Sequence, residues 1–152
     1  MGIINTIKSC LNYKQWTISS PFRWAKHPKN DIRASSKTVV VGITYARLHH
    51  DKRLRRLFLN HVKRVNTSLA EQQGFIGSSL RSQPFGDEAW TVSVWENKHD
   101  MQQFVYSEPH LSAMKEASKT MAAAKTTHIE LDATDLPLKW RKILTILHEK
   151  CN

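Results

Sequence analysis

Two histidines on apolar helical stripes are the side chains of this sequence best suited to chemistry. His110 falls in the first turn of a helix predicted over residues 108–124, where the helix dipole favours a neutral imidazole with a free lone pair. Such a ring can act as a proton acceptor. His61 lies on the apolar stripe of a helix predicted over residues 51–73. The alternatives are structural: His110 beside a capping turn, and His61 as a hydrogen-bonded core residue.

Other candidate residues offer a phenol, a positive charge or an apolar wall. Tyr45 and Arg47 share one face of a strand predicted over residues 38–48 and could orient an anionic ligand, or else cap the rim of the fold. Aromatic and methionine side chains could form the wall of a pocket, although residues of these types at such spacings commonly belong to a core. The candidates of this kind are Trp90, Phe104, Tyr106 and Met114.

Motifs for metal or nucleotide chemistry are missing from the sequence. It contains no GxGxxG, GxxxxGK[ST], HExxH, CxxC or GxSxG pattern. The two cysteines, Cys10 and Cys151, cannot form a disulfide framework and have no histidine or cysteine cluster beside them. We therefore expect no metal site, no resident cofactor and a reducing compartment.

Hydrophobic periodicity predicts one α+β domain with an extension at each end. Residues 1–37 form an N-terminal arm, residues 38–135 the domain, and residues 136–152 a C-terminal amphipathic helix. The expected elements of the domain are, in order, a strand at 38–48, a helix at 51–73, strands at 75–83 and 89–95, helices at 98–105 and 108–124, and a strand at 126–132.

This order predicts a ferredoxin-like βαββαβ fold with a four-stranded antiparallel sheet and helices on one face. The other face of such a sheet would be uncovered. A homodimer that buries this face against a second copy is therefore expected.

Three segments carry a family likeness: GFIG at 74–77, WTVSVWEN at 90–97 and FVYSEPHLSAMK at 104–115. They resemble the antibiotic biosynthesis monooxygenase-type domains of the dimeric α+β barrel superfamily, over residues 38–135. The resemblance implies a pocket between sheet and helices for a small aromatic or quinone-like molecule, oxidised by O₂ without a cofactor. His110 would then be the base, Tyr45 or Arg47 would orient the anion, and His61 would line the pocket. Because the family also holds domains without known activity, the motifs are more specific for the fold than for the chemistry.

The haem-degrading members of this family give the first alternative. When their strand-end Trp is aligned on Trp95, their haem-site Asn, Trp and His fall on Tyr45, Phe104 and Met114, and all three differ. His110 precedes Met114 by one turn on the same helix face, so a displaced iron ligand is the haem hypothesis.

The basic ends of the chain give a second, non-enzymatic alternative. Residues 1–37 carry seven basic side chains and one acidic one, residues 136–152 carry four and one, and the domain between them is nearly neutral. A basic groove within the fold, and with it nucleic-acid binding, is therefore not expected. The amphipathic arm could instead contact an anionic membrane surface or a protein partner.

The N-terminus leaves the question of lipidation open. Residues 1–6 match the N-myristoylation pattern at Gly2, and Cys10 could take a second acyl chain. Residues 1–37 contain no secretory h-region with a small-residue cleavage site, and no apolar run in the sequence reaches the ~18 residues of a membrane span. A cytoplasmic protein, with peripheral membrane contact through residues 1–37 as the alternative, is expected.

Overall fold

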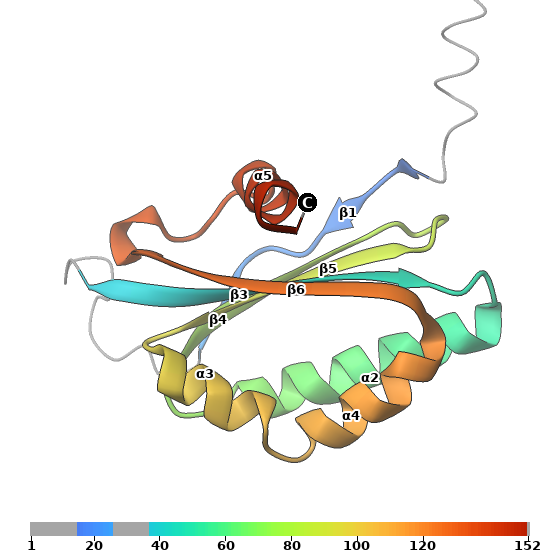
Figure 1. The fold of residues 1–152 in the computed structure, drawn as a ribbon, viewed down its shortest axis with the longest axis horizontal. Helices are drawn as coiled ribbons and strands as arrows, with labels where there is room; N and C mark the ends of the chain where they lie inside the picture. Colours follow the sequence, from blue (N-terminus) through green and yellow to red (C-terminus); the bar gives the residue numbers. More distant parts are fainter. Residues whose placement is uncertain (1–14, 26–36, 152) are drawn as a thin grey trace, which may run out of the picture.

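The computed structural model describes residues 15–25 and 37–151, which form one mixed sheet-and-helix unit (Figure 1). The strands are β1 (Ile18–Ser19), β2 (Arg23–Trp24), β3 (Thr38–Leu48), β4 (Phe75–Ser82), β5 (Glu88–Trp95) and β6 (Met121–Asp132). The helices are α2 (Lys52–Leu69), α3 (Lys98–Val105), α4 (His110–Ala117) and α5 (Trp140–Cys151). Short 3₁₀ turns follow α4 at Ser118–Thr120 and β6 at Ala133–Asp135.

The strands pair in the order β4-β5-β3-β6, and every pairing is antiparallel. The short strands β1 and β2 both pair with β4 at its outer edge. The crossover from β3 through α2 to β4, and the second one from β5 through α3 and α4 to β6, give the ferredoxin-like topology. The predicted α+β fold is confirmed.

Local signals in the sequence explain where the elements begin. The Asp51 carboxylate accepts hydrogen bonds from the backbone N–H groups of Arg53 (2.7 Å) and Leu54 (3.0 Å), which caps α2. Asn97 caps α3 in the same way by accepting from the Asp100 N–H at 2.9 Å. Gly74 leads into β4 with a positive φ of 72°, a conformation that costs glycine little.

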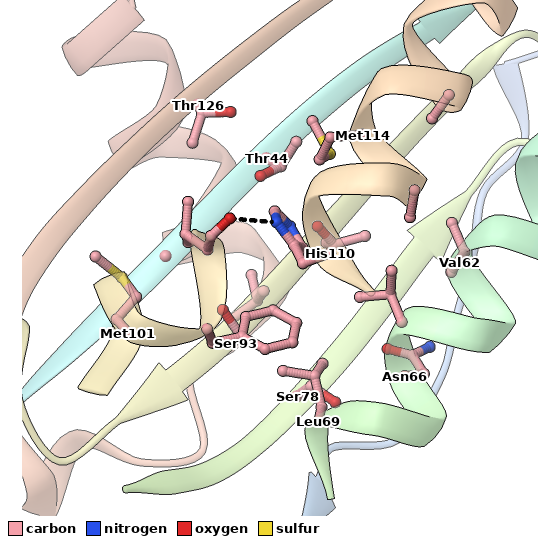
Figure 2. A pocket seen from close by; sticks show the side chains of 18 of the residues that line it. Thr44, Val62, Asn66, Leu69, Ser78, Ser93, Met101, His110, Met114 and Thr126 are labelled. Carbon is pink, nitrogen blue, oxygen red and sulfur yellow. Dashed lines mark hydrogen bonds between the residues drawn. The ribbon is translucent and has the colours of Figure 1, made fainter. Parts of the chain in front are cut away.

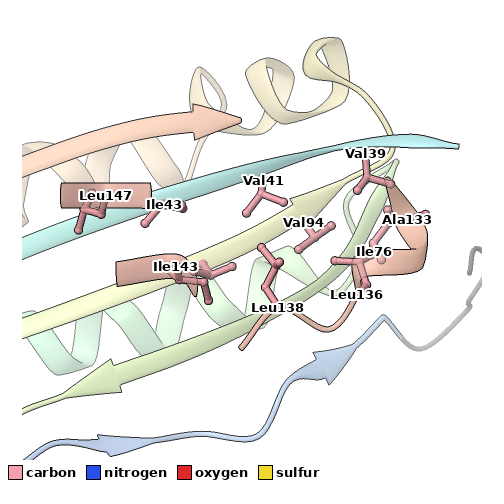
Figure 3. Close-up of a cluster of buried hydrophobic side chains, with 11 residues drawn as sticks. Val39, Val41, Ile43, Ile76, Val94, Ala133, Leu136, Leu138, Ile143 and Leu147 are labelled. Atoms are coloured by element: carbon pink, nitrogen blue, oxygen red, sulfur yellow. The ribbon is translucent and has the colours of Figure 1, made fainter. Parts of the chain in front are cut away.

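The two faces of the sheet are covered by different helices. Helices α2, α3 and α4 lie on one face and α5 lies on the other (Figure 1). Helix α5 and the segment before it pack on the sheet in a buried apolar cluster (Figure 3). The members of this cluster are Val39, Val41, Ile43, Ile76, Val92, Val94, Ala133, Leu136, Leu138, Ile143 and Leu147.

The prediction that this second face is uncovered is therefore wrong. The apolar stripe of the C-terminal helix docks on the sheet of its own chain, with Ile143 only 1% exposed. Burial of the sheet no longer requires a second copy, so the homodimer loses the argument on which it was based and stays a prediction.

The boundary between α4 and β6 also differs from expectation. The helix predicted over 108–124 ends at Ala117, and β6 begins at Met121 rather than at residue 126. The cause is pairing with β3, whose last residues Arg47 and Leu48 are partnered by Ala123 and Met121. These ladder hydrogen bonds override the helix preference of the alanines at 122–124.

The N-terminal arm is described only in part. Residues 16–24, expected to be irregular, form β1 and β2 against β4. The predicted amphipathic helix around residues 3–11 and the lipidation candidates Gly2 and Cys10 lie outside the described residues. None of the helices in the described ranges is both long and apolar enough to cross a bilayer.

Candidate functional site

A cavity of about 570 Å³ lies between the sheet and the layer of helices α2, α3 and α4 (Figure 2). Small side chains on the sheet leave room for it. The strand register places Ser78, Ser93 and Gly42 in one row across β4, β5 and β3, and the next row contains Thr91 and Thr44. On the opposite face the same strands carry Val and Ile side chains packed against α5. On the cavity side these rows therefore carry short side chains, and larger sheet residues, Leu80 and Trp95, line the cavity beside them.

Helical side chains enclose the cavity with a largely apolar surface. Helix α2 contributes Phe58, Val62 and Val65, and the region from α3 to α4 contributes Met101 and Phe104. Such a lining suits an apolar or aromatic ligand held by a few polar groups.

One side of the cavity reaches the surface. Tyr106, Leu111 and Met114, which line it from the α3–α4 connection and from α4, are 71%, 44% and 39% exposed. Thr126 and His128 line it from β6 and are exposed as well. These exposed residues place one opening of the cavity between α4 and β6.

His110 presents a nitrogen lone pair at this cavity. Its Nδ1 lies 2.9 Å from the carbonyl oxygen of Val105, as the dashed line in Figure 2 marks. A carbonyl only accepts hydrogen bonds, so Nδ1 must carry a proton, and in a neutral ring the lone pair is then on Nε2. The ring also packs on Phe104, with ring centroids 4.8 Å apart. These two contacts fix both the tautomer and the orientation of His110.

His61 lines the cavity from α2 and is only 5% exposed. Its Nδ1 lies 2.5 Å from Nη2 of Arg64, one turn further along α2. The same Arg64 nitrogen lies 3.1 Å from the Glu116 carboxylate, so an ion pair joins α2 to α4 beside this histidine. A guanidinium only donates hydrogen bonds, so Nδ1 of His61 is the acceptor and Nε2 carries the proton.

Three of the predicted site residues lie on the other face of the sheet, and this corrects the expectation that they share a site with His110. Tyr45 pairs with Trp90 in the strand register, and their ring centroids are 5.8 Å apart. Both pack against the α5 cluster, and Arg47 follows Tyr45 by two residues on the same strand face. The even-numbered residues of β3 are the ones that line the cavity, so the odd-numbered Tyr45 and Arg47 point away from it.

Tyr45 has a structural partner on that face. Its hydroxyl donates a hydrogen bond of 2.6 Å to the Glu88 carboxylate. Burial and this bond to Glu88 raise the pKa of Tyr45 from 10.0 to about 12. A phenol held neutral in this way anchors the β4–β5 hairpin and is remote from the cavity.

The remaining predicted residues surround the cavity together. His61, Phe104, His110, Met114 and Tyr106 all line it, with Met114 and Tyr106 on its exposed side. The sequence analysis did not identify the polar side chains on the sheet floor of the cavity. These include Thr44, Ser78 and Ser93. For Thr44 the signal was the set of small residues at alternate positions of β3, Gly42, Thr44 and Ala46, which marks the strand face that leaves space.

The residues at the haem-site positions do not suit iron ligation. Tyr45, which occupies the position of the haem-site Asn, lies on the sheet face away from the cavity. Phe104 and Met114, at the Trp and His positions, offer no imidazole or amide. The ligand set of the haem-degrading members therefore does not fit this cavity. Within the described ranges, no group of three or more His, Cys, Asp or Glu residues could hold a metal ion.

A family model for a domain of unknown function, DUF3291, matches residues 39–131. The chain belongs to the DUF3291 family. Comparison with curated protein sequences finds no match. The matched residues of this DUF3291 chain extend from β3 to β6 and include every wall of the cavity.

Solved structures similar to this DUF3291 chain include several proteins described as monooxygenases. SnoaB, a cofactor-independent oxygenase from Streptomyces nogalater, is 15% identical, with a TM-score of 0.51, over 66% of this chain and 98% of that chain. A candidate antibiotic biosynthesis monooxygenase from Nitrosomonas europaea is 14% identical, with a TM-score of 0.53, over 62% and 88% of the two chains.

A third similar structure is that of a candidate monooxygenase from Lactobacillus acidophilus. It is 14% identical, with a TM-score of 0.55, over 78% of this chain, but the match spans only 50% of that longer protein. At these identities the likeness concerns the fold. The DUF3291 chain thus has the ferredoxin-like fold of the antibiotic biosynthesis monooxygenase-type proteins.

Proposed function

We propose that this chain binds a small, largely apolar aromatic or quinone-like molecule in the cavity and oxidises it with O₂, with His110 as the base. The observation that carries the proposal is the fixed tautomer of His110, whose Nδ1–H donates to Val105 and whose Nε2 lone pair is on the wall of an apolar cavity of about 570 Å³. The fold shared with the cofactor-independent oxygenase SnoaB supports the same activity.

The first step is removal of a proton from a phenolic hydroxyl of the ligand by His110. The resulting imidazolium keeps its hydrogen bond to the Val105 carbonyl, and this bond strengthens when the ring becomes charged. An apolar wall that excludes water makes the phenolate a stronger electron donor toward O₂. The chain therefore needs to hold the ligand and take up one proton.

The electrons for the oxidation come from the ligand. A ring CH₂ group conjugated with the phenolate loses four electrons when it becomes a carbonyl, and one O₂ takes up four. One oxygen atom enters the new carbonyl group, and the other leaves as water with the two hydrogens of the CH₂ group. The reaction is balanced without any further reductant.

The test uses 1,8-dihydroxyanthrone, a polycyclic phenol with such a CH₂ group, and follows O₂ uptake beyond the background rate without protein. His110→Ala should reduce the catalysed rate by about 10²–10⁴-fold, the range for loss of a general base. His99→Ala is the matched control, because His99 is exposed on α3 and does not line the cavity. Full activity of His110→Ala would remove His110 from the reaction, and saturable binding without O₂ uptake would refute the oxidation.

A further inference from the structure

The second cavity histidine, His61, carries a polar group that its own chain leaves unused. The residue is 5% exposed, and its Nδ1 accepts a hydrogen bond from Arg64. Within the described part of the chain, no hydrogen bond reaches Nε2 of this ring. Within the described residues, the buried side-chain nitrogen or oxygen without a partner is Nε of Arg81. Nε2 of His61 is therefore not sealed in the packing, and it is available to a ligand in the cavity that this residue lines.

The direction of this N–H follows from the shape of the ring. The two nitrogens of an imidazole point to opposite sides, and Nδ1 of His61 points toward the Arg64–Glu116 pair. The side chains of that pair are 59% and 54% exposed, so Nδ1 faces the solvent side of α2 and α4. Nε2–H therefore faces the interior, where His61 lines the cavity.

The ion pair beside His61 determines which nitrogen is protonated. Arg64 can only donate, so it requires a lone pair on Nδ1 and leaves the proton on Nε2. Glu116 can only accept, and its carboxylate oxygen lies 3.5 Å from the same Nδ1. Without Arg64, the carboxylate would draw a proton onto Nδ1. Arg64 thus competes successfully with Glu116 for His61.

We propose that His61 is the residue that recognises a carbonyl-type oxygen of the ligand, and that Arg64, itself held by its ion pair with Glu116, is the positioning residue that keeps His61 as a hydrogen-bond donor. This inference rests on the proposed function, because it takes the cavity as the ligand site. The two histidines then have opposite polarity: His110 accepts from the α4 side and His61 donates from the α2 side. The ligand class is an aromatic molecule with a carbonyl oxygen at one edge and an ionisable hydroxyl at another.

A binding experiment on the full chain separates recognition of the oxygen from binding of the apolar skeleton. The probes are α-tetralone and tetralin, which share a bicyclic skeleton and differ by one carbonyl oxygen. The dissociation constant of tetralin divided by that of α-tetralone should fall by about three- to tenfold in His61→Phe, because this variant loses one hydrogen bond to the ketone but keeps a flat apolar ring. Tetralin itself should bind the variant as well as it binds the native chain.

Each result has a distinct meaning. An unchanged ratio in His61→Phe, with both probes bound, overturns the donor role of His61 and leaves the cavity as a ligand site. Failure of both probes to bind the native chain overturns the proposed function and this inference together.

The tautomer is tested directly by ¹⁵N NMR of the histidine rings without any ligand. The native chain should show His61 protonated on Nε2 only and His110 protonated on Nδ1 only. Arg64→Met should place a proton on Nδ1 of His61, whereas Arg53→Met, an exposed substitution on the same helix, should leave its spectrum unchanged. An unprotonated Nε2 of His61 in the native chain, or no response to Arg64→Met, would overturn the positioning role.

Discussion

Replacement of Ile143 by Ala measures how firmly α5 covers the sheet. The Ile143 side chain is 1% exposed within the cluster that joins α5 to β3 and β5. The substitution removes three carbons, at about 0.8 kcal/mol for each buried methylene, and leaves a cavity whose cost adds to this sum. The free energy of unfolding should therefore decrease by about 3 kcal/mol, within the usual range for Ile→Ala in a core.

Urea unfolding followed by circular dichroism gives this value. With a urea dependence of about 1.5–2 kcal/mol per molar, the midpoint should fall by roughly 1.5–2 M at an unchanged slope. Arg141→Ala, at an exposed position on the same helix, should change the stability by no more than about 0.5 kcal/mol. A loss below about 1 kcal/mol for Ile143→Ala would refute the docking of α5 and restore the argument for burial by a second copy.

Three further predictions concern the turn before β4, the α5 face and the haem hypothesis. Gly74→Ala should lower the free energy of unfolding by about 1–3 kcal/mol, because φ is 72° and the added methyl would collide with the Asp100 carboxylate; an unchanged melting temperature would contradict this. The pKa of Tyr45 is raised by burial and by Glu88 to about 12, so its contribution to stability is complete below pH 10 and is lost as the pH rises through 12. Absorbance titration should show one tyrosine ionising above the others, and that step should be missing in Tyr45→Phe. Haemin should give no saturable Soret shift, and a shift abolished by His110→Ala would instead identify haem as the ligand.

Local patterns predicted the elements well where the signal is contained in a few residues. The β-branched run from Thr38 to Leu48 predicted β3 with the observed bounds, and the Asn97 cap predicted the start of α3. The start of β6 was missed because Ala122 to Ala124 favour a helix, and only pairing with a distant strand makes them extended.

The sequence predicted the helical residues of the candidate site correctly but not those on the strands. The apolar stripe of an amphipathic helix faces the protein interior, because its apolar side chains are buried there. His61 and His110 lie on such stripes and could be placed at the interior from the sequence. A strand buried on both faces gives no such direction, because alternation separates two sets of side chains without indicating which set meets which layer. Tyr45 and Arg47 were assigned to the wrong set, and only the docking of α5 decides between the two.

Because helices cover both faces of the sheet, the interior has two separate regions, one on each side of the sheet, with different roles. The α5 side is filled by large aliphatic side chains and holds the strands together, whereas much of the cavity floor is formed by the short side chains of Gly42, Thr44, Ser78, Thr91 and Ser93. Substitutions on the cavity floor can therefore reshape the ligand site without loosening the packing beneath it. Within one family, the ligand could diverge widely while the same framework is retained.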